Sequence, residues 1–197
     1  MATVIPRTEA ALFLFQWVSE EAAVGLRVAA AASVDLPEAA EASAVVVRAG
    51  VGKMRTKEFL SKLEHDEIVR AIREAESKTS GEIRVFIQRG KLEGDPLIAA
   101  QKKFHKLGMH KVPERNAILI FVAPRAHKFA VVGDKAIHDK CGESFWQRLA
   151  DSMREHFRNE RFSPALVEAI EEAGKALASH FPGKSTPNQL PDEVVEG

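Results

Sequence analysis

Three acidic residues in the second half of the chain are the first candidates for chemistry. Asp134 follows an apolar run, and Asp139 and Glu143 are four residues apart, so they would share one face of a helix. Carboxylate oxygens are the hard ligands that Ca²⁺ and Mg²⁺ choose in proteins. We therefore identify Asp134, Asp139 and Glu143 as a candidate metal site for one of these cations. The alternative is a turn residue, a helix cap and a solvated surface acid, because the sequence has no calcium-loop pattern of alternating acids.

Histidine and cysteine form no stronger motif. His105, His110 and His138 make neither a His-Glu-x-x-His pattern nor an i, i+4 pair, so we interpret them as scattered surface side chains. Cys141 lies where we expect a helix to begin, which would lower the pKa of its thiol. A tyrosine-phosphatase loop needs an arginine six positions after the cysteine, and that position is Gln147. Walker, Asp-x-Asp and Gly-x-Gly-x-x-Gly motifs are missing from the sequence as well, so the catalytic residues stay unknown.

The elements that must position these residues follow from periodicity and turn chemistry. Apolar residues at helical spacing predict a helix over 66–79, with Asp66 as its cap and Gly81 as its stop. Alternation of apolar and polar residues then predicts a strand over 82–89.

The next elements are a helix and two strands. Asp95 and the proline after it predict a helix over 95–108. A continuous apolar run predicts a strand over 116–123 that is buried on both faces. A short turn then leads into a returning strand over 128–133.

Two amphipathic helices complete the domain, one with an apolar stripe from Phe145 to Phe157 and one with a stripe from Leu166 to Phe181. The helix between the first two strands predicts parallel pairing with a right-handed crossover. The short turn between the last two predicts an antiparallel hairpin. The fold class is therefore α/β, a small mixed β-sheet sandwiched between helices.

Composition bounds the class of protein. The chain has 197 residues, 28 basic and 28 acidic side chains, and 45% hydrophobic residues. This hydrophobic content excludes wholesale disorder, and the zero net charge excludes a nucleic-acid binder that relies on excess Lys and Arg. The single cysteine excludes an intramolecular disulfide framework and a Cys-based metal finger. No apolar run reaches the roughly 18 residues of a transmembrane anchor. We expect a soluble, cytoplasmic protein that is monomeric or weakly oligomeric.

Changes in composition divide the chain into three parts. Residues 1–53 are rich in Ala and Val, and we expect a disordered leader or a start codon assigned too early. The apolar run over 11–18 leaves export as an alternative, and Val45–Val47 is the segment best suited to add an edge strand. Residues 54–182 should form one domain. Residues 183–197, punctuated by prolines, should form a disordered tail.

Short motifs along this domain resemble the TPM domain family. They are Ser80-Gly-Glu-Ile83, Arg115-Asn-Ala-Ile-Leu-Ile-Phe-Val-Ala-Pro124, His127-Lys-Phe-Ala-Val-Val-Gly-Asp134 with Ile137, and Phe157 with Phe162-Ser163. The family takes its name from a thylakoid-lumen phosphatase-like protein, a photosystem assembly factor and a worm receptor modulator. The resemblance covers about 65–182 and implies an α/β/α sandwich. The roles that it implies range from weak acid phosphatase activity and divalent-metal binding to photosystem repair and receptor assistance. The sequence lacks the clean signal peptide, membrane anchor and Gly-rich tail of many members, which favours a cytoplasmic form.

Two hypotheses about function stay open. The preferred one is a non-enzymatic interaction or assembly-type module that binds a protein partner and is tuned by a divalent cation. The alternative is a weak metal-dependent acid phosphatase in which Asp134 and Asp139 hold the ion. In that case Lys135 or Arg125 would steer the phosphate. An enzyme needs a nucleophile or an activated water with a base in reach, and the sequence identifies neither.

Overall fold

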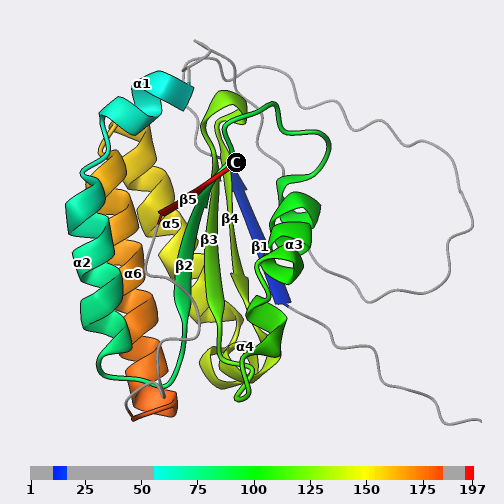
Figure 1. The fold of residues 1–197 in the computed structure, drawn as a ribbon, viewed down its shortest axis with the longest axis vertical. Helices are drawn as coiled ribbons and strands as arrows, with labels where there is room; N and C mark the ends of the chain where they lie inside the picture. Colours follow the sequence, from blue (N-terminus) through cyan, green and yellow to red (C-terminus); the bar gives the residue numbers. More distant parts are fainter. Residues whose placement is uncertain (1–10, 17–55, 184–193) are drawn as a thin grey trace, which may run out of the picture.

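The computed structural model describes residues 11–16, 56–183 and 194–197 (Figure 1). In chain order the elements are β1 (Ala11–Gln16), α1 (Thr56–Ser61), α2 (His65–Glu76), β2 (Ile83–Ile87), α3 (Pro96–Lys106), η1 (Met109–Lys111), β3 (Ile118–Ala123), η2 (Pro124–Ala126), β4 (Lys128–Gly133), α4 (Lys135–Cys141), α5 (Glu143–Arg158), α6 (Phe162–His180) and β5 (Val194–Glu196). The two η elements are short 3-10 helices. The strands form one mixed sheet in the order β1-β4-β3-β2-β5.

The centre of the sheet has the predicted pairing. β2 and β3 run parallel, with Ile83 opposite Ile118, and α3 lies in the crossover between them. β3 and β4 run antiparallel, with Ile118 opposite Gly133. The turn between them places His127 in the left-handed region at a φ of 50°. Both the parallel crossover and the antiparallel hairpin are therefore confirmed.

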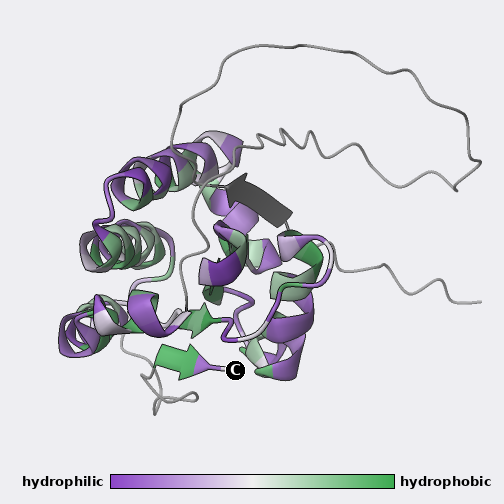
Figure 2. Ribbon diagram, turned by 90° about the horizontal axis from the view of Figure 1, so that it is seen from above, coloured by the Kyte–Doolittle hydropathy of each residue, from purple (hydrophilic) through white to green (hydrophobic). Residues whose placement is uncertain are grey.

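Helices cover both faces of the sheet, and each face has its own core. Ile83, Val85 and Ile87 of β2 lie on the face of the sheet that α2, α5 and α6 cover, and they pack against residues of those helices. On the opposite face, under α3, the rings of Phe86 and Phe121 stack with their centroids 5.7 Å apart. Every residue of β3 is buried, as its continuous apolar run predicts. Figure 2 shows hydrophilic colour on the outward surfaces of the helices. The α/β sandwich is confirmed.

The ends of two helices test the predicted caps. α3 begins after Asp95, whose carboxylate accepts hydrogen bonds from backbone N–H groups of the first turn, as predicted. For α2 the prediction is wrong, because Glu64 occupies the cap position and Asp66 lies inside the first turn. Gly81 is not the stop of α2, which ends earlier in the chain. A Cβ at Gly81 would lie 2.6 Å from Cδ2 of Leu177, so close packing against α6 explains this glycine.

The last two long helices carry the predicted apolar stripes toward the sheet. The buried stripe residues are Leu149, Met153 and Phe157 in α5, and Leu166, Ile170, Ala173 and Leu177 in α6. None of the helices within the described ranges is both long and apolar enough to span a lipid bilayer.

Both edge strands come from segments that we expected outside the domain. β1, from the predicted leader, pairs antiparallel with the whole of β4. β5, from the predicted tail, pairs parallel with β2, with Val194 opposite Val85. The physical reason is that β2 and β4 otherwise present rows of unpaired backbone N–H and C=O groups. The amino-acid composition of the leader and the tail does not predict this backbone pairing. The remainder of the leader, including Val45–Val47, lies outside the described residues.

Candidate functional site

The antiparallel direction of β4 decides where the candidate metal ligands lie. Asp134 directly follows β4, and the residue before it, Gly133, is opposite Ile118 at the start of β3. The Asp134 backbone N–H donates to the carbonyl of Ala117, 2.8 Å away. Asp134 therefore lies at the end of the sheet where β2 and β3 begin. Ligands of open α/β sheets usually bind at the opposite end of the sheet, beyond the carboxyl ends of the parallel strands.

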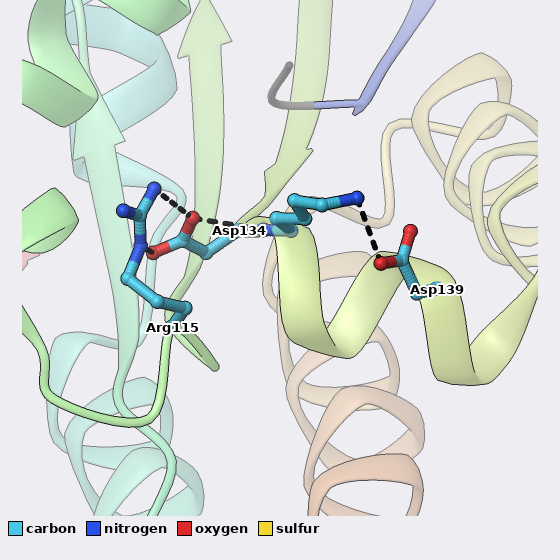
Figure 3. Close-up of polar contacts among 4 residues, drawn as sticks. Arg115, Asp134 and Asp139 are labelled. Atoms are coloured by element: carbon cyan, nitrogen blue, oxygen red, sulfur yellow. Dashed lines mark hydrogen bonds and ion pairs between the residues drawn. The ribbon is translucent and has the colours of Figure 1, made fainter. Parts of the chain in front are cut away.

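Asp134 forms a buried ion pair with Arg115 (Figure 3). The carboxylate is fully buried, and it accepts hydrogen bonds from Nε of Arg115 at 2.8 Å and from its terminal nitrogen at 2.7 Å. It also accepts from the backbone N–H of Lys135 at 2.8 Å, which caps α4. The hydrogen bond to Asp134 raises the pKa of the Arg115 guanidinium. The pair ties the end of β4 to the loop before β3.

The other two predicted ligands do not join Asp134. Asp139, on α4, forms an ion pair with Lys135 and accepts a hydrogen bond from its Nζ at 2.9 Å. Figure 3 shows Asp139 away from Arg115. Glu143 begins α5 and is exposed. Among the described residues, no three His, Cys, Asp or Glu side chains are grouped to hold a metal ion. Cation binding by these three residues stays a prediction.

A second polar cluster lies at the same end of the sheet. The hydroxyl of Ser80 donates a short hydrogen bond to the Glu114 carboxylate. The amide nitrogen of Asn116 donates to both groups at 3.2 Å. Asn116 is fully buried, and its amide oxygen finds no hydrogen-bond partner within the described part of the chain. The cluster joins the segment before β2 to the segment before β3.

Residue type and spacing alone indicate no site role for Arg115, Glu114 or Asn116, although the family motifs include Arg115 and Asn116. A usable signal was present. A predicted hairpin between 116–123 and 128–133 already sets Asp134 beside the residues that precede β3. Extending that register would have selected Arg115 as the partner of the buried acid.

The Ser80–Glu114 pair has the components of an activated nucleophile but a weak base. A hydroxyl in contact with a general base can act as a nucleophile. A carboxylate is a weaker base toward a hydroxyl than the histidine that commonly activates a serine nucleophile. The arrangement therefore favours a structural hydrogen bond between two loops.

Cys141 does not lie at a helix start, so the predicted position is wrong. It is the last residue of α4, and α5 begins after Gly142, whose φ is 68°. Partial burial raises the pKa of the Cys141 thiol, opposite to the expected direction. A raised pKa leaves less thiolate at neutral pH, so this thiol is a poor nucleophile.

The histidines named in the sequence analysis do not converge. The rings of His105 and His110 lie with centroids 4.8 Å apart at the end of α3, while His138 stacks near Trp146 in the other core. The contact between His105 and His110 brings two imidazoles together. Among the described residues, no third Cys, His or carboxylate ligand is grouped with them. His105 is exposed, whereas His110 and His138 are half-buried and so are not the surface side chains that we expected.

One further polar cluster joins α5 to α6, and no motif in the sequence indicates it. The Glu168 carboxylate accepts a hydrogen bond from the Ser152 hydroxyl at 2.6 Å and contacts Nε2 of His156 at 2.7 Å. The hydrogen bond from Ser152, followed by that from His156, lowers the pKa of Glu168. In a hydrolytic triad the histidine lies between the hydroxyl and the carboxylate. Here the carboxylate lies in the middle, so the cluster is a hydrogen-bonded contact that links α5 to α6.

Comparison with known proteins places the fold and these motifs in one family. The model of the TPM domain matches residues 54–176. The solved NMR structure of the BA42 protein from the psychrophilic bacterium Bizionia argentinensis is 38% identical. The match covers 68% of this chain and 92% of that one, with a TM-score of 0.63. A comparison with curated proteins gives no significant match. The resemblance expected from the motifs is confirmed, and the chain belongs to the TPM domain family.

Proposed function

We propose that this TPM-domain chain is a non-enzymatic interaction module. The observation that supports it best is the pairing of Asp134, the acid at the centre of the candidate site. Its two oxygens receive three hydrogen bonds, two from Arg115 and one from the Lys135 backbone. A carboxylate held in this way is a structural element of the domain, because a metal ion or a substrate proton would have to displace Arg115.

The chemistry of hydrolysis needs a nucleophile, a base and a charge stabiliser within reach of one another. In the described residues, two pairs at this end of the sheet already bond to each other: Lys135 with Asp139, and Ser80 with Glu114. A protein-binding role needs only a rigid scaffold with accessible backbone or side-chain groups.

Phosphomonoester hydrolysis is a second candidate, and one observation favours it. The Ser80–Glu114 pair lies at the same end of the sheet as Arg115, a cation of the kind that binds phosphate. In that reading the Ser80 oxygen attacks the phosphorus and gives its proton to Glu114, while the ester P–O bond breaks and the leaving alcohol takes up that proton. Water then attacks the phosphoserine, breaks its P–O bond and releases inorganic phosphate and the Ser80 hydroxyl.

A turnover assay with the full chain separates the two candidates. We expect no hydrolysis of p-nitrophenyl phosphate above buffer with Ca²⁺, Mg²⁺ or EDTA. Turnover that Ser80→Ala abolishes, and that the exposed-site control Ser77→Ala retains, would overturn the module in favour of the enzyme.

The cation is tested separately by thermal melting. If Asp139 and Glu143 help to hold Ca²⁺ or Mg²⁺, millimolar cation raises the melting temperature of the chain, and Asp139→Asn with Glu143→Gln removes the rise. A melting temperature that the cation leaves unchanged would remove the cation from the proposal and leave the interaction module standing.

A further inference from the structure

We propose that the side of β2 that does not pair with β3 is a recognition groove. It would bind an extended peptide with two apolar residues followed by an acidic one. In this chain its own segment Val194–Gly197 occupies the groove. The inference rests on the proposed function, since it gives the interaction module the chemistry of its partner.

The backbone of β2 provides the first part of the groove. β5 adds to it as a parallel strand, with Val195 opposite Phe86 (Figure 1). The pairing continues past β5, because the Gly197 N–H donates to the carbonyl of Ile87 at 3.2 Å. The Arg89 N–H in turn donates to the carbonyl of Gly197 at 2.7 Å. Hydrogen bonds of this kind do not depend on side chains, so any extended segment of the right direction can make them.

Two apolar contacts provide selection at neighbouring positions. Val194 packs against the core under α2 and α6, and Val195 packs against the core under α3 that contains Phe86. Successive side chains of a strand point to opposite faces, so the groove takes one apolar side chain on each face of the sheet. Both valines are only half-buried, which leaves room for a larger aliphatic side chain.

Two basic groups select the acidic position. The carboxylate of Glu196 lies 2.5 Å from Nε of Arg89, and a second Arg89 nitrogen contacts the same oxygen. Its other oxygen lies 3.4 Å from Nε2 of His65 at the start of α2. The Glu196 side chain is 19% exposed, whereas that of Arg89 is 62% exposed. The acid is therefore mostly covered, while the arginine that holds it stays mostly in solvent.

The contact of the tail with β2 is small enough to be displaced. β5 has 3 residues, and none of them is buried. Its advantage over an external peptide is the covalent tether to α6, which corresponds to an effective concentration in about the millimolar range. An external partner must exceed that concentration or bind more tightly, so removing the tail should reveal the groove.

Fluorescence anisotropy with a labelled peptide of residues 192–197 tests the proposal. We expect saturable binding to a chain that lacks 194–197 and at least 10-fold weaker binding to the full chain. If the shortened chain does not fold, the full chain with Val195→Asp provides a second receptor whose own tail cannot dock. No binding to either receptor, or equal binding to the full chain, would overturn the proposal.

Charge reversal tests the acidic position. A peptide with Glu196→Lys should lose at least 10-fold in affinity, and Arg89→Glu in the receptor should recover part of it. A peptide with Ile-Ile-Asp in place of Val-Val-Glu should bind within about 10-fold of the original, while a scrambled peptide should not bind. Equal binding of the scrambled peptide would overturn the recognition pattern. Phosphatase turnover would overturn the proposed function without changing these affinities, so the two failures are distinguishable.

Discussion

At the residue scale, Asp134 is a fully buried carboxylate beside a guanidinium that is 37% exposed. Removing a charge from water is unfavourable unless another charge and hydrogen bonds replace the water. Arg115 supplies both, and its exposed part stays hydrated. The pair therefore joins β4 to β3 while it keeps the acid away from solvent.

Replacing Arg115 should be far more harmful than breaking an exposed pair nearby. We expect Arg115→Met to lower the free energy of unfolding by about 3 kcal/mol, because it leaves the buried Asp134 unpaired. The control Lys135→Met breaks the exposed ion pair with Asp139 and should lower it by at most about 1 kcal/mol. Urea unfolding followed by circular dichroism measures both. Equal losses in the two variants would show that Arg115 does not balance the charge of Asp134.

At the element scale, the contact between α2 and α6 depends on a glycine in the middle of α6. A Cβ added to Gly174 would lie 2.6 Å from Cβ of Ala75 on α2, well inside van der Waals contact. Glycine is unfavourable within a helix by about 1 kcal/mol relative to alanine. The close approach of the two helices explains its presence.

Gly174→Ala should therefore destabilise the protein although it improves helix propensity. Overpacking of a core contact is unfavourable by about 1–3 kcal/mol, which exceeds the gain in propensity. The matched control is Gly90→Ala, where the new Cβ would meet only Nε2 of Gln88 at 3.4 Å. Adding Ala75→Gly to Gly174→Ala should restore packing. A Gly174→Ala variant that melts at a higher temperature than the wild type would contradict the close contact.

At the scale of the whole molecule, the three central strands depend on edge strands from distant parts of the chain. β1 covers the whole length of β4, whereas β5 covers only part of β2. An uncovered strand edge is a template for pairing with another chain.

Deleting residues 1–53 should increase self-association more than deleting 194–197 does. The first deletion exposes the backbone of all of β4, and the second exposes a shorter stretch of β2. We expect a lower melting temperature and a concentration-dependent dimer for the first variant, measured by sedimentation velocity. A monomeric variant with an unchanged melting temperature would show that β1 contributes nothing to the fold.

Local chemistry in the sequence was enough to determine the centre of this protein. Apolar periodicity placed β3, β4, α5 and α6, and the Asp95 cap placed the start of α3. Chain order then determined that β2 and β3 are parallel and that β3 and β4 form a hairpin. These features depend on residues close together in the chain, so their signals survive without a structure.

Only the tertiary structure decided the edges of the sheet and the partners of the polar residues. β1 and β5 are selected by unpaired backbone groups of strands far away in the chain, which side-chain patterns do not encode. The acid Asp134 could be read as a metal ligand from its type and position. Its pairing with Arg115 depends on the register of the hairpin and on a backbone φ of 53° at Arg115, which orient the two side chains toward each other.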